Sequence, residues 1–309
     1  MRTHARTVIV GAGIVGCSAA YHLTQLGRRD IVVLDRGPLY QTGGSTSHAP
    51  GLIFQTNGSR LMCWMAQYTT RLLSQLSYEG EPCWYPVGGI EVATTEARLN
   101  DLKRRHGLAT AYGLEAGLLS PAEVRLLIPI LDDRAILGGY FVPSDGDTRG
   151  WQSAAALAQL AIDSGGAEFH GDTAVNDIPI ENGRAAGVVT DQATIRAAEV
   201  LLCTNIWGPV LAGRAGVRLP LMAVEHQYLI SEPLTELAGE TRFITHPILR
   251  HQDARLYYRQ HADAYGIGSY NPEPPLVAPH DPRPGGRAPE PGPPRGRRRH
   301  APGAGSVEP

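Results

Sequence analysis

The sequence predicts an α/β fold: a sheet of parallel strands joined by helices, with an inserted α+β layer. The first observation is a pair of short apolar strands, at 7–10 and 31–34, that flank a helix over 13–26. The second is a wholly apolar strand at 199–204, suited to the middle of the same sheet. Continuous apolar runs of this length are typical of parallel strands that are buried on both faces.

Grouping the elements by type predicts a discontinuous domain organisation. One domain would comprise residues 1–84 and 149–214. The second domain would be incomplete, would be built on an antiparallel sheet, and would comprise residues 85–148 and 215–270. Residues 271–309 are dense in proline, glycine and arginine and contain few large apolar side chains. Because such a segment cannot offset its ordering entropy by burial, we expect it to be a disordered tail.

The helices are predicted from apolar residues at helical spacing and from capping signals. Val15, Ala19 and Leu23 form one stripe of the first helix, and Gly27 ends it. Ser120-Pro-Ala-Glu123 combines a capping residue, a proline at the first helical position and an acid in the first turn. Three further helices are expected. One covers 60–76 and is capped by Asn57 or Ser59, a second runs through Leu102 and Lys103, and a third covers 151–164.

The remaining strands are predicted from β-branched and alternating apolar residues. They are expected at 87–95, 167–175, 226–231 and 256–270. Asn182-Gly183 predicts a hairpin turn, because this pair tolerates the positive φ angles of a type I′ turn.

The composition excludes several classes of protein. An apolar fraction of 42%, a charged fraction of 19% and a net charge of -2 are those of a globular protein without a basic surface for nucleic acid. No apolar run approaches the roughly 20 residues that span a bilayer, so no membrane partner is expected. The N-terminus runs directly into a strand, which predicts no signal peptide and a cytoplasmic location. Cys17, Cys63, Cys83 and Cys203 are scattered, which favours buried reduced thiols over disulfides or a metal site.

The segment Gly11-Ala-Gly13-Ile-Val-Gly16 follows a strand and opens a helix, as in a Rossmann-type dinucleotide-binding domain. Gly11 permits the tight turn, Gly13 lets the backbone approach a pyrophosphate, and Gly16 lets helix and strand pack closely. The helix N-terminus favours anions. Asp35 ends the second strand, where it could accept ribose hydroxyls.

The stretch from Gly43 to Gly51, GGSTSHAPG, favours FAD over NAD as the dinucleotide. It is rich in glycine and hydroxyl groups, which suits a backbone that follows the ribityl chain of a flavin. An NAD(P)-dependent dehydrogenase would usually continue with another βα unit at this point. The sequence therefore predicts an FAD-binding domain.

These motifs resemble those of the D-amino-acid oxidase superfamily of FAD enzymes. Within this superfamily, they are most similar to the dimethylglycine oxidase and sarcosine dehydrogenase branch. The resemblance covers residues 7–270 and rests most specifically on the GSTSHAPGL string. It continues through PVGGIEVATTEARLNDLKRRHG, LLSPAE, VPSDG, HQYLIS and ILRHQDARLYYRQHADAYGIGSY.

The resemblance implies roles for particular residues. His48 matches the histidine that this branch links covalently to the flavin 8α-methyl group, and imidazole nitrogen is a competent nucleophile. His226 and Tyr258 match the active-site histidine and tyrosine. Because Tyr257 and Tyr258 are adjacent in a strand, they point to opposite faces, and the sequence leaves open which one faces the flavin. The implied cofactor-binding residues are Gly11, Gly13, Ile14, Val15, Gly16, Asp35, Arg36, Ser45, Thr46, Ser47, His48, Leu52 and Val175.

The resemblance also implies a reaction. An amine such as dimethylglycine or sarcosine would transfer hydride to flavin N5 and leave an iminium. The final electron acceptor would be oxygen or an electron-transfer flavoprotein. His226 could influence protonation of the amine, and a tyrosine hydroxyl could hold the substrate carboxylate.

Residues after Tyr270 depart from the family pattern, and this leaves an alternative open. The segment that would complete the flavin domain is not recognisable, and the composition changes abruptly at that point. The sequence therefore predicts either an active amine oxidoreductase or a truncated, flavin-binding fragment without catalytic activity.

Overall fold

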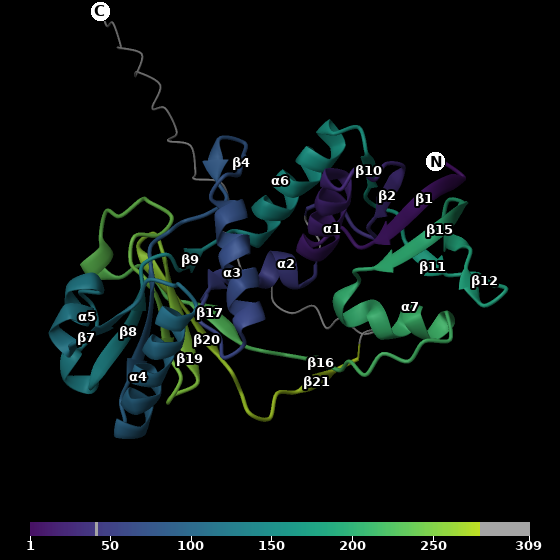
Figure 1. Cartoon of the computed structure of the whole chain (residues 1–309). Coiled ribbons are helices and arrows are strands. Elements are labelled where there is room, and N and C mark those ends of the chain that lie inside the picture. The colour runs from purple at the N-terminus through teal and green to yellow at the C-terminus, as the bar shows by residue number, and fades with distance from the viewer. Residues whose placement is uncertain (41–42, 279–309) are drawn as a thin grey trace, which may run out of the picture.

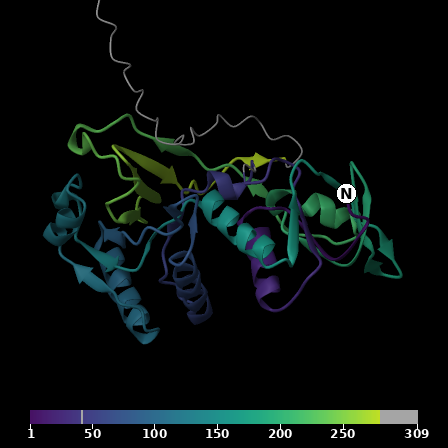
Figure 2. The same ribbon diagram turned by 90° about the horizontal axis from the view of Figure 1, so that it is seen from above.

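The computed structural model describes residues 1–40 and 43–278, and its two main sheets lie side by side in two lobes (Figures 1 and 2). The first sheet has six strands in the order β10-β2-β1-β15-β14-β11. The second has seven strands in the order β17-β20-β19-β18-β6-β8-β7. Helices pack on both sheets, so the predicted α/β class with an α+β layer is confirmed.

The first sheet confirms the strands predicted at 7–10, 31–34 and 199–204. Val8 lies opposite Val200 and Val32 in parallel register, which places the late strand directly beside the first one. The parallel strands are β10 (Ala167–His170), β2 (Ile31–Leu34), β1 (His4–Val10) and β15 (Thr194–Leu202), followed by the antiparallel β14 (Gly187–Thr190) and β11 (Val175–Asp177). β15 is less buried than its apolar sequence predicts, since Leu201 is 40% exposed.

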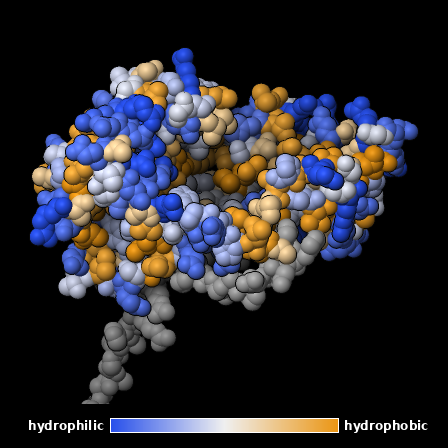
Figure 3. Space-filling model, turned by 90° about the horizontal axis from the view of Figure 1, so that it is seen from below, coloured by the Kyte–Doolittle hydropathy of each residue, from blue (hydrophilic) through white to orange (hydrophobic). Residues whose placement is uncertain are grey.

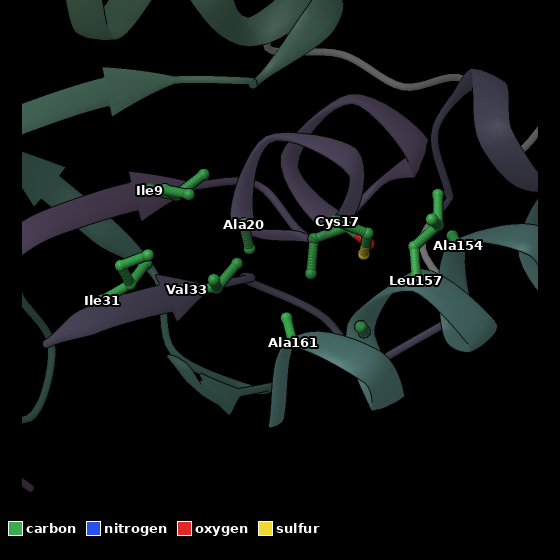
Figure 4. Close-up of a cluster of buried hydrophobic side chains, with 10 residues drawn as sticks. Ile9, Cys17, Ala20, Ile31, Val33, Ala154, Leu157 and Ala161 are labelled. Atoms are coloured by element: carbon green, nitrogen blue, oxygen red, sulfur yellow. The ribbon is translucent and has the colours of Figure 1, made fainter. Parts of the chain in front are cut away.

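Two helices cover one face of this sheet and build its main core (Figure 4). They are α1 (Ile14–Gln25) and α6 (Gly150–Asp163). Small side chains let the two helices and the sheet approach closely. The cluster contains Ile9, Cys17, Ala20, Ile31, Val33, Ala154, Leu157 and Ala161. On the opposite face, α7 (Gly208–Arg214) contributes Leu211 to a second cluster.

The second sheet is antiparallel except where β18 pairs with β6 in parallel. Its strands are β6 (Gly89–Ala93), β7 (Gly117–Leu119), β8 (Gly138–Val142), β17 (Tyr228–Ile230), β18 (Ile248–His251), β19 (Leu256–His261) and β20 (Ala264–Ser269). α4 (Glu96–Ala111) packs near Tyr140, and α5 (Pro121–Leu127) packs on Ile90. The predicted capping box is confirmed, because the Ser120 and Glu123 side chains each bond the other residue's backbone.

The remaining elements lie outside the two main sheets and their covering helices. They are α2 (Ser45–His48), α3 (Arg60–Leu73), β3 (Leu52–Ile53), β4 (Ser77–Tyr78), β5 (Glu81–Pro82), β9 (Gly146–Asp147), β12 (Ile180–Glu181), β13 (Arg184–Ala185) and the 3-10 turns at Asp133–Ala135, Asn205–Trp207 and Thr235–Leu237. The predicted hairpin turn is confirmed, since Asn182 and Gly183 have φ angles of 52° and 74°. Ser59 caps α3, as predicted.

The C-terminal part of the described chain corrects two predictions. Residues 256–270 form a hairpin of two strands, because Ala262 takes a left-handed turn conformation between them. Residues 271–278 are ordered rather than disordered, since β21 (Leu276–Val277) pairs with β16 (Ala223–Val224). Pro272, Pro274 and Pro275 precede this short strand, so none of the three interrupts its pairing. The rest of the predicted tail, 279–309, lies outside the described residues.

Candidate functional site

A cavity of about 1170 Å³ lies between the two sheets. Pockets for small molecules and cofactors commonly have volumes of about 300–1000 Å³, so this one is large enough for a dinucleotide. One end is lined by the glycine motif, and the other by Phe54, Arg250, Tyr257 and Tyr270. Figure 3 shows a hollow between the two halves of the molecule, with apolar side chains at its walls.

The glycine motif has the conformation that its sequence predicts. Gly11 has a φ of +106°, which L residues rarely adopt. A Cβ atom at Gly16 would collide with the carbonyl oxygen of Gly11, so only glycine allows α1 to pack this closely against the preceding turn. The first N–H groups of α1 have no partner within the helix. They lie at the end of the cavity that the glycine motif lines, where an anion could bind.

Asp35 fixes the loop between β1 and α1 at the end of β2. Its Oδ2 accepts a hydrogen bond from the Ala12 amide at 2.7 Å, and its Oδ1 accepts one from Gly37 at 3.1 Å. A carboxylate has about four acceptor sites, so both oxygens keep capacity for a ligand hydroxyl. Asp35 lines the cavity, as do Arg36 and Trp207, which stack at 4.2 Å.

The hydroxyl-rich loop lies directly over the start of α1. The Thr46 Oγ1 atom accepts a hydrogen bond from the Ile14 amide at 2.9 Å, while the Asn205 side chain donates to Ser45 Oγ at 2.6 Å. Because α1 has Gly13 at its N-cap and no side-chain cap of its own, Thr46 supplies the missing acceptor.

Thr46→Val is expected to lower the free energy of unfolding by about 1 kcal/mol, the usual value of a helix cap. Urea denaturation of the flavin-free proteins would measure this. Thr110→Val, at an exposed threonine on α4, is the matched control. Equal stability of Thr46→Val and the parent protein would contradict the capping role.

His48 is exposed at the end of α2 and is not among the residues that line the cavity. Its Nδ1 atom lies 2.9 Å from the carbonyl oxygen of Gly44, so Nδ1 carries the hydrogen of this bond. In the neutral ring, the lone pair then resides on Nε2, which has no hydrogen-bond partner among residues 1–40 and 43–278. The ring is therefore held in the tautomer that leaves Nε2 nucleophilic.

Several polar groups at the cavity wall suit a polar ligand. Thr204 Oγ1, Trp207 Nε1 and Arg250 Nε are buried and have no hydrogen-bond partner among the described residues. All three residues line the cavity. Unpaired buried polar groups are costly, and their position along both halves of the cavity fits a cofactor or substrate with hydrogen-bonding atoms.

The sheet register shows which of the two adjacent tyrosines of β19 faces the cavity. Tyr257 lies opposite Arg250, and both line the cavity. Tyr258 lies opposite Leu249 and packs with it on the other face, in the cluster that contains Val124. Of the two tyrosines, Tyr257 therefore faces the cavity and Tyr258, the residue that the resemblance implied, faces the other side of the sheet.

Tyr257 and Tyr270 form an aromatic pair with ring centroids 5.0 Å apart. A Cβ atom at Gly268 would collide with the Tyr257 ring, so glycine at this position permits the ring to lie across β20. Burial raises the pKa of Tyr257, and the neighbouring Tyr270 raises it further, so the hydroxyl stays protonated at neutral pH. His226 is exposed beside Tyr270, with ring centroids 6.0 Å apart.

The structure brings together most, but not all, of the predicted site residues. Those that line the cavity are Gly11, Gly13, Ile14, Val15, Asp35, Arg36, Ser45, Thr46, Leu52 and Val175. Gly16, Ser47, His48, His226 and Tyr258 are outside this lining. Sequence reasoning assigned no role to Phe54, Trp207, Arg250 and Tyr270, which also line the cavity. Arg250 and Tyr270 lie within the string ILRHQDARLYYRQHADAYGIGSY, but nothing in that string distinguishes them from their neighbours.

Other kinds of site find no support within the described part of the chain. The four cysteines are free, and burial raises the pKa of Cys17 to about 12. No group of three or more His, Cys, Asp or Glu side chains in residues 1–40 and 43–278 is arranged to hold a metal ion. Within the same residues, no helix combines the length and apolarity that crossing a membrane requires.

The fold combines a Rossmann-type sheet with a second, mixed sheet, and the cavity between them is lined at one end by a glycine motif of the dinucleotide-binding type. The FAD dependent oxidoreductase family (DAO) matches residues 6–301, beyond the 7–270 range of the motifs described above. The chain belongs to this family.

The chain is similar to individual members of this family. Sarcosine dehydrogenase, mitochondrial, of Mus musculus is 31% identical over 87% of this chain and 29% of its own length. The pyruvate dehydrogenase phosphatase regulatory subunit, mitochondrial, of Mus musculus is 32% identical over 87% of this chain and 31% of its length. The chain thus spans less than a third of each of these curated relatives. The crystal structure of L-proline dehydrogenase from P. horikoshii has a TM-score of 0.75 at 22% identity, over 87% of this chain and 70% of that one, which shows the shared fold.

Proposed function

We propose that the chain binds FAD and oxidises a secondary or tertiary amine that carries a carboxylate, such as sarcosine or dimethylglycine. The observation that carries this proposal is one continuous cavity, which runs from the glycine motif to a wall formed by Arg250, Tyr257 and Tyr270. A dinucleotide would occupy the glycine end, and a small amine would occupy the other. The likeness to sarcosine dehydrogenase supports this substrate class.

The glycine motif, Thr46 and Asp35 would hold the cofactor. The helix N-terminus would face the pyrophosphate, and the Asp35 carboxylate would accept the ribose hydroxyls. Bound FAD would supply the two-electron acceptor for a hydride from the carbon next to the substrate nitrogen. The substrate would become an iminium, which water can hydrolyse.

The residues at the other end would orient the amine. The protonated Tyr257 hydroxyl can donate a hydrogen bond to a substrate oxygen, and the Tyr257 and Tyr270 rings can contact N-methyl groups. His226, whose ring lies beside that of Tyr270, would assist in removing the ammonium proton before hydride transfer. Covalent attachment through His48, a cytoplasmic location, and oxygen or an electron-transfer flavoprotein as acceptor remain parts of this proposal.

The adjacent tyrosines provide a direct test of the active-site assignment. Tyr257→Phe is expected to lower kcat/KM for dimethylglycine roughly tenfold, the effect of about one lost hydrogen bond, without altering stability. Tyr258→Phe should retain the parent kcat/KM, because its ring packs away from the cavity. Steady-state kinetics on both variants would decide, and a larger loss in Tyr258→Phe would restore the original assignment.

A second function is favoured by one comparison. The pyruvate dehydrogenase phosphatase regulatory subunit is about as similar to this chain as sarcosine dehydrogenase is. Its name is that of a regulatory subunit, which suits a chain that binds flavin without catalysis. Anaerobic addition of dimethylglycine separates the two functions, since an active enzyme bleaches the flavin absorption near its visible maximum. Glycine betaine is the matched control ligand, because its quaternary nitrogen has no lone pair to form the iminium. Flavin that stays oxidised with sarcosine and dimethylglycine would favour the non-catalytic function.

A further inference from the structure

Arg259 is a buried cation that the proposed function does not use. It lies on β19 two residues after Tyr257, so the two side chains leave the same face of the strand. Only 5% of Arg259 is exposed, and its guanidinium carbon lies 4.4 Å from the centroid of the Phe243 ring. An arginine is rarely buried to this extent unless its charge is paired. The partners of this guanidinium therefore indicate its role.

The counter-ion of Arg259 is Asp147 on β9. The Nη1 atom of Arg259 lies 3.2 Å from Asp147 Oδ1, and the Asp147 side chain is completely buried. Neither oxygen of this carboxylate has a hydrogen-bond partner among residues 1–40 and 43–278. The charges of Arg259 and of Arg149, which also stacks on Phe243, therefore compensate its burial. A buried ion pair adds little net stability once desolvation is counted, so stability alone does not account for this pair.

The same Nη1 atom of Arg259 donates a hydrogen bond to the carbonyl oxygen of Pro50. Pro50 is two residues after His48 in the hydroxyl-rich loop, and it lines the cavity. A hydrogen bond from a charged donor is roughly twice as strong as a neutral one. Since Asp147 is also the antiparallel neighbour of Leu52, one guanidinium joins β19, β9 and the end of the loop.

The segment that carries His48 is anchored at its ends. α2 has only four residues, and its N-cap glycine provides no side-chain cap. Beyond His48, the Gly51 carbonyl accepts a hydrogen bond from the Thr148 amide at 3.0 Å. A Cβ atom at Gly51 would lie 1.9 Å from the Thr148 carbonyl oxygen, so the two backbones are in close contact. The position of His48 therefore depends on the anchor at Thr46 before it and on those at Pro50 and Gly51 after it.

We propose that Arg259 is a positioning residue that holds the loop, and with it His48, in the position that covalent attachment of the flavin requires. This inference rests on the proposed function. In the attachment step, a proton leaves the 8α-methyl group, the Nε2 lone pair of His48 forms a bond to that carbon, and the Nδ1 hydrogen is released. The two electrons pass to the flavin, which oxygen then reoxidises. Because a misplacement of about 1 Å can slow a reaction roughly 100-fold, this step depends on where the loop holds the ring.

The test follows covalent attachment separately from flavin binding. Arg259→Gln combined with Asp147→Asn removes both charges, so that no unpaired charge stays buried. Protein produced under riboflavin limitation is mixed with FAD, and the flavin in the acid precipitate is measured over time. The double variant should attach flavin roughly 100-fold more slowly, and its total bound flavin should equal that of the parent protein. Arg98→Gln combined with Asp253→Asn is the control, because this ion pair, at 3.1 Å, joins α4 to the turn between β18 and β19.

An unchanged rate of attachment in the double variant would overturn the inference. A parallel loss of total bound flavin would also overturn it, because that result indicates a merely structural role. If the double variant does not fold, Arg259→Lys replaces it, since lysine keeps the charge beside Asp147 but its side chain is one atom shorter. This variant should slow attachment roughly tenfold, as expected for one lost hydrogen bond, and an unchanged rate would contradict the role of Arg259.

A failure of the proposed function has a different signature. A parent protein that binds no FAD, or releases all of it in acid, would refute flavin binding or its attachment through His48. Hydrogen exchange then decides the role of Arg259, because the amides of residues 44–49 should exchange faster in the double variant than in the parent protein and the control. Equal exchange in the three proteins would overturn the inference.

Discussion

Gly13→Val is expected to abolish flavin binding, with at least a roughly 100-fold loss of affinity, or about 2.7 kcal/mol. A valine at this position would project its branched side chain into the space that the pyrophosphate must approach. Its Cβ atom would lie only 2.9 Å from Thr46 Oγ1, so it would also disturb the hydroxyl that caps α1. Flavin content per polypeptide, from the visible absorption of the purified variant, measures the effect.

Gly107→Val provides the control for this substitution. Gly107 lies within α4, and a Cβ atom there would meet no other atom within 4 Å. This variant should therefore purify with the flavin content of the parent protein. A Gly13→Val protein that remained yellow at the same stoichiometry would mean that the cofactor binds elsewhere.

His48→Ala is expected to convert a covalently held flavin completely into one that acid releases. The tautomer fixed by Gly44 leaves Nε2 as the nucleophile, and alanine has no group to form the bond. The variant should still fold and bind flavin reversibly, because Thr46 and the glycine motif are unchanged. Flavin in the acid precipitate and in the supernatant, measured by fluorescence, gives the two fractions.

His106→Ala is the matched control for His48→Ala. Its ring nitrogen also lies near a carbonyl oxygen, that of Ala116, at 3.2 Å, but on α4 and outside the cavity. Flavin that remained in the precipitate of His48→Ala would assign the covalent bond to a different residue.

Local patterns predicted those elements that depend on neighbours in sequence. The strand at Ile31–Leu34 has the predicted bounds, and Ser120 and Glu123 form the expected capping box. Asn182-Gly183 forms the expected turn. The glycine motif and Asp35 were recognisable because their spacing reflects the shape of one βαβ unit.

The other half of the site depends on contacts between distant segments. Periodicity predicts that Tyr257 and Tyr258 face opposite sides of a strand, but only the pairing with β18 decides which side is the cavity. Arg250 was not distinguishable among the many arginines of the sequence, since its isolation from carboxylates is a property of the folded sheet. β21 was missed because its partner, β16, lies more than fifty residues earlier.

We propose that this chain holds FAD in the cavity between its two sheets. An absorption spectrum of the purified protein, recorded before and after acid precipitation, tests it most directly. We expect a flavin spectrum with close to one FAD per chain, and flavin that stays with the precipitated protein through His48. A colourless protein that takes up no FAD when the cofactor is added would contradict the account.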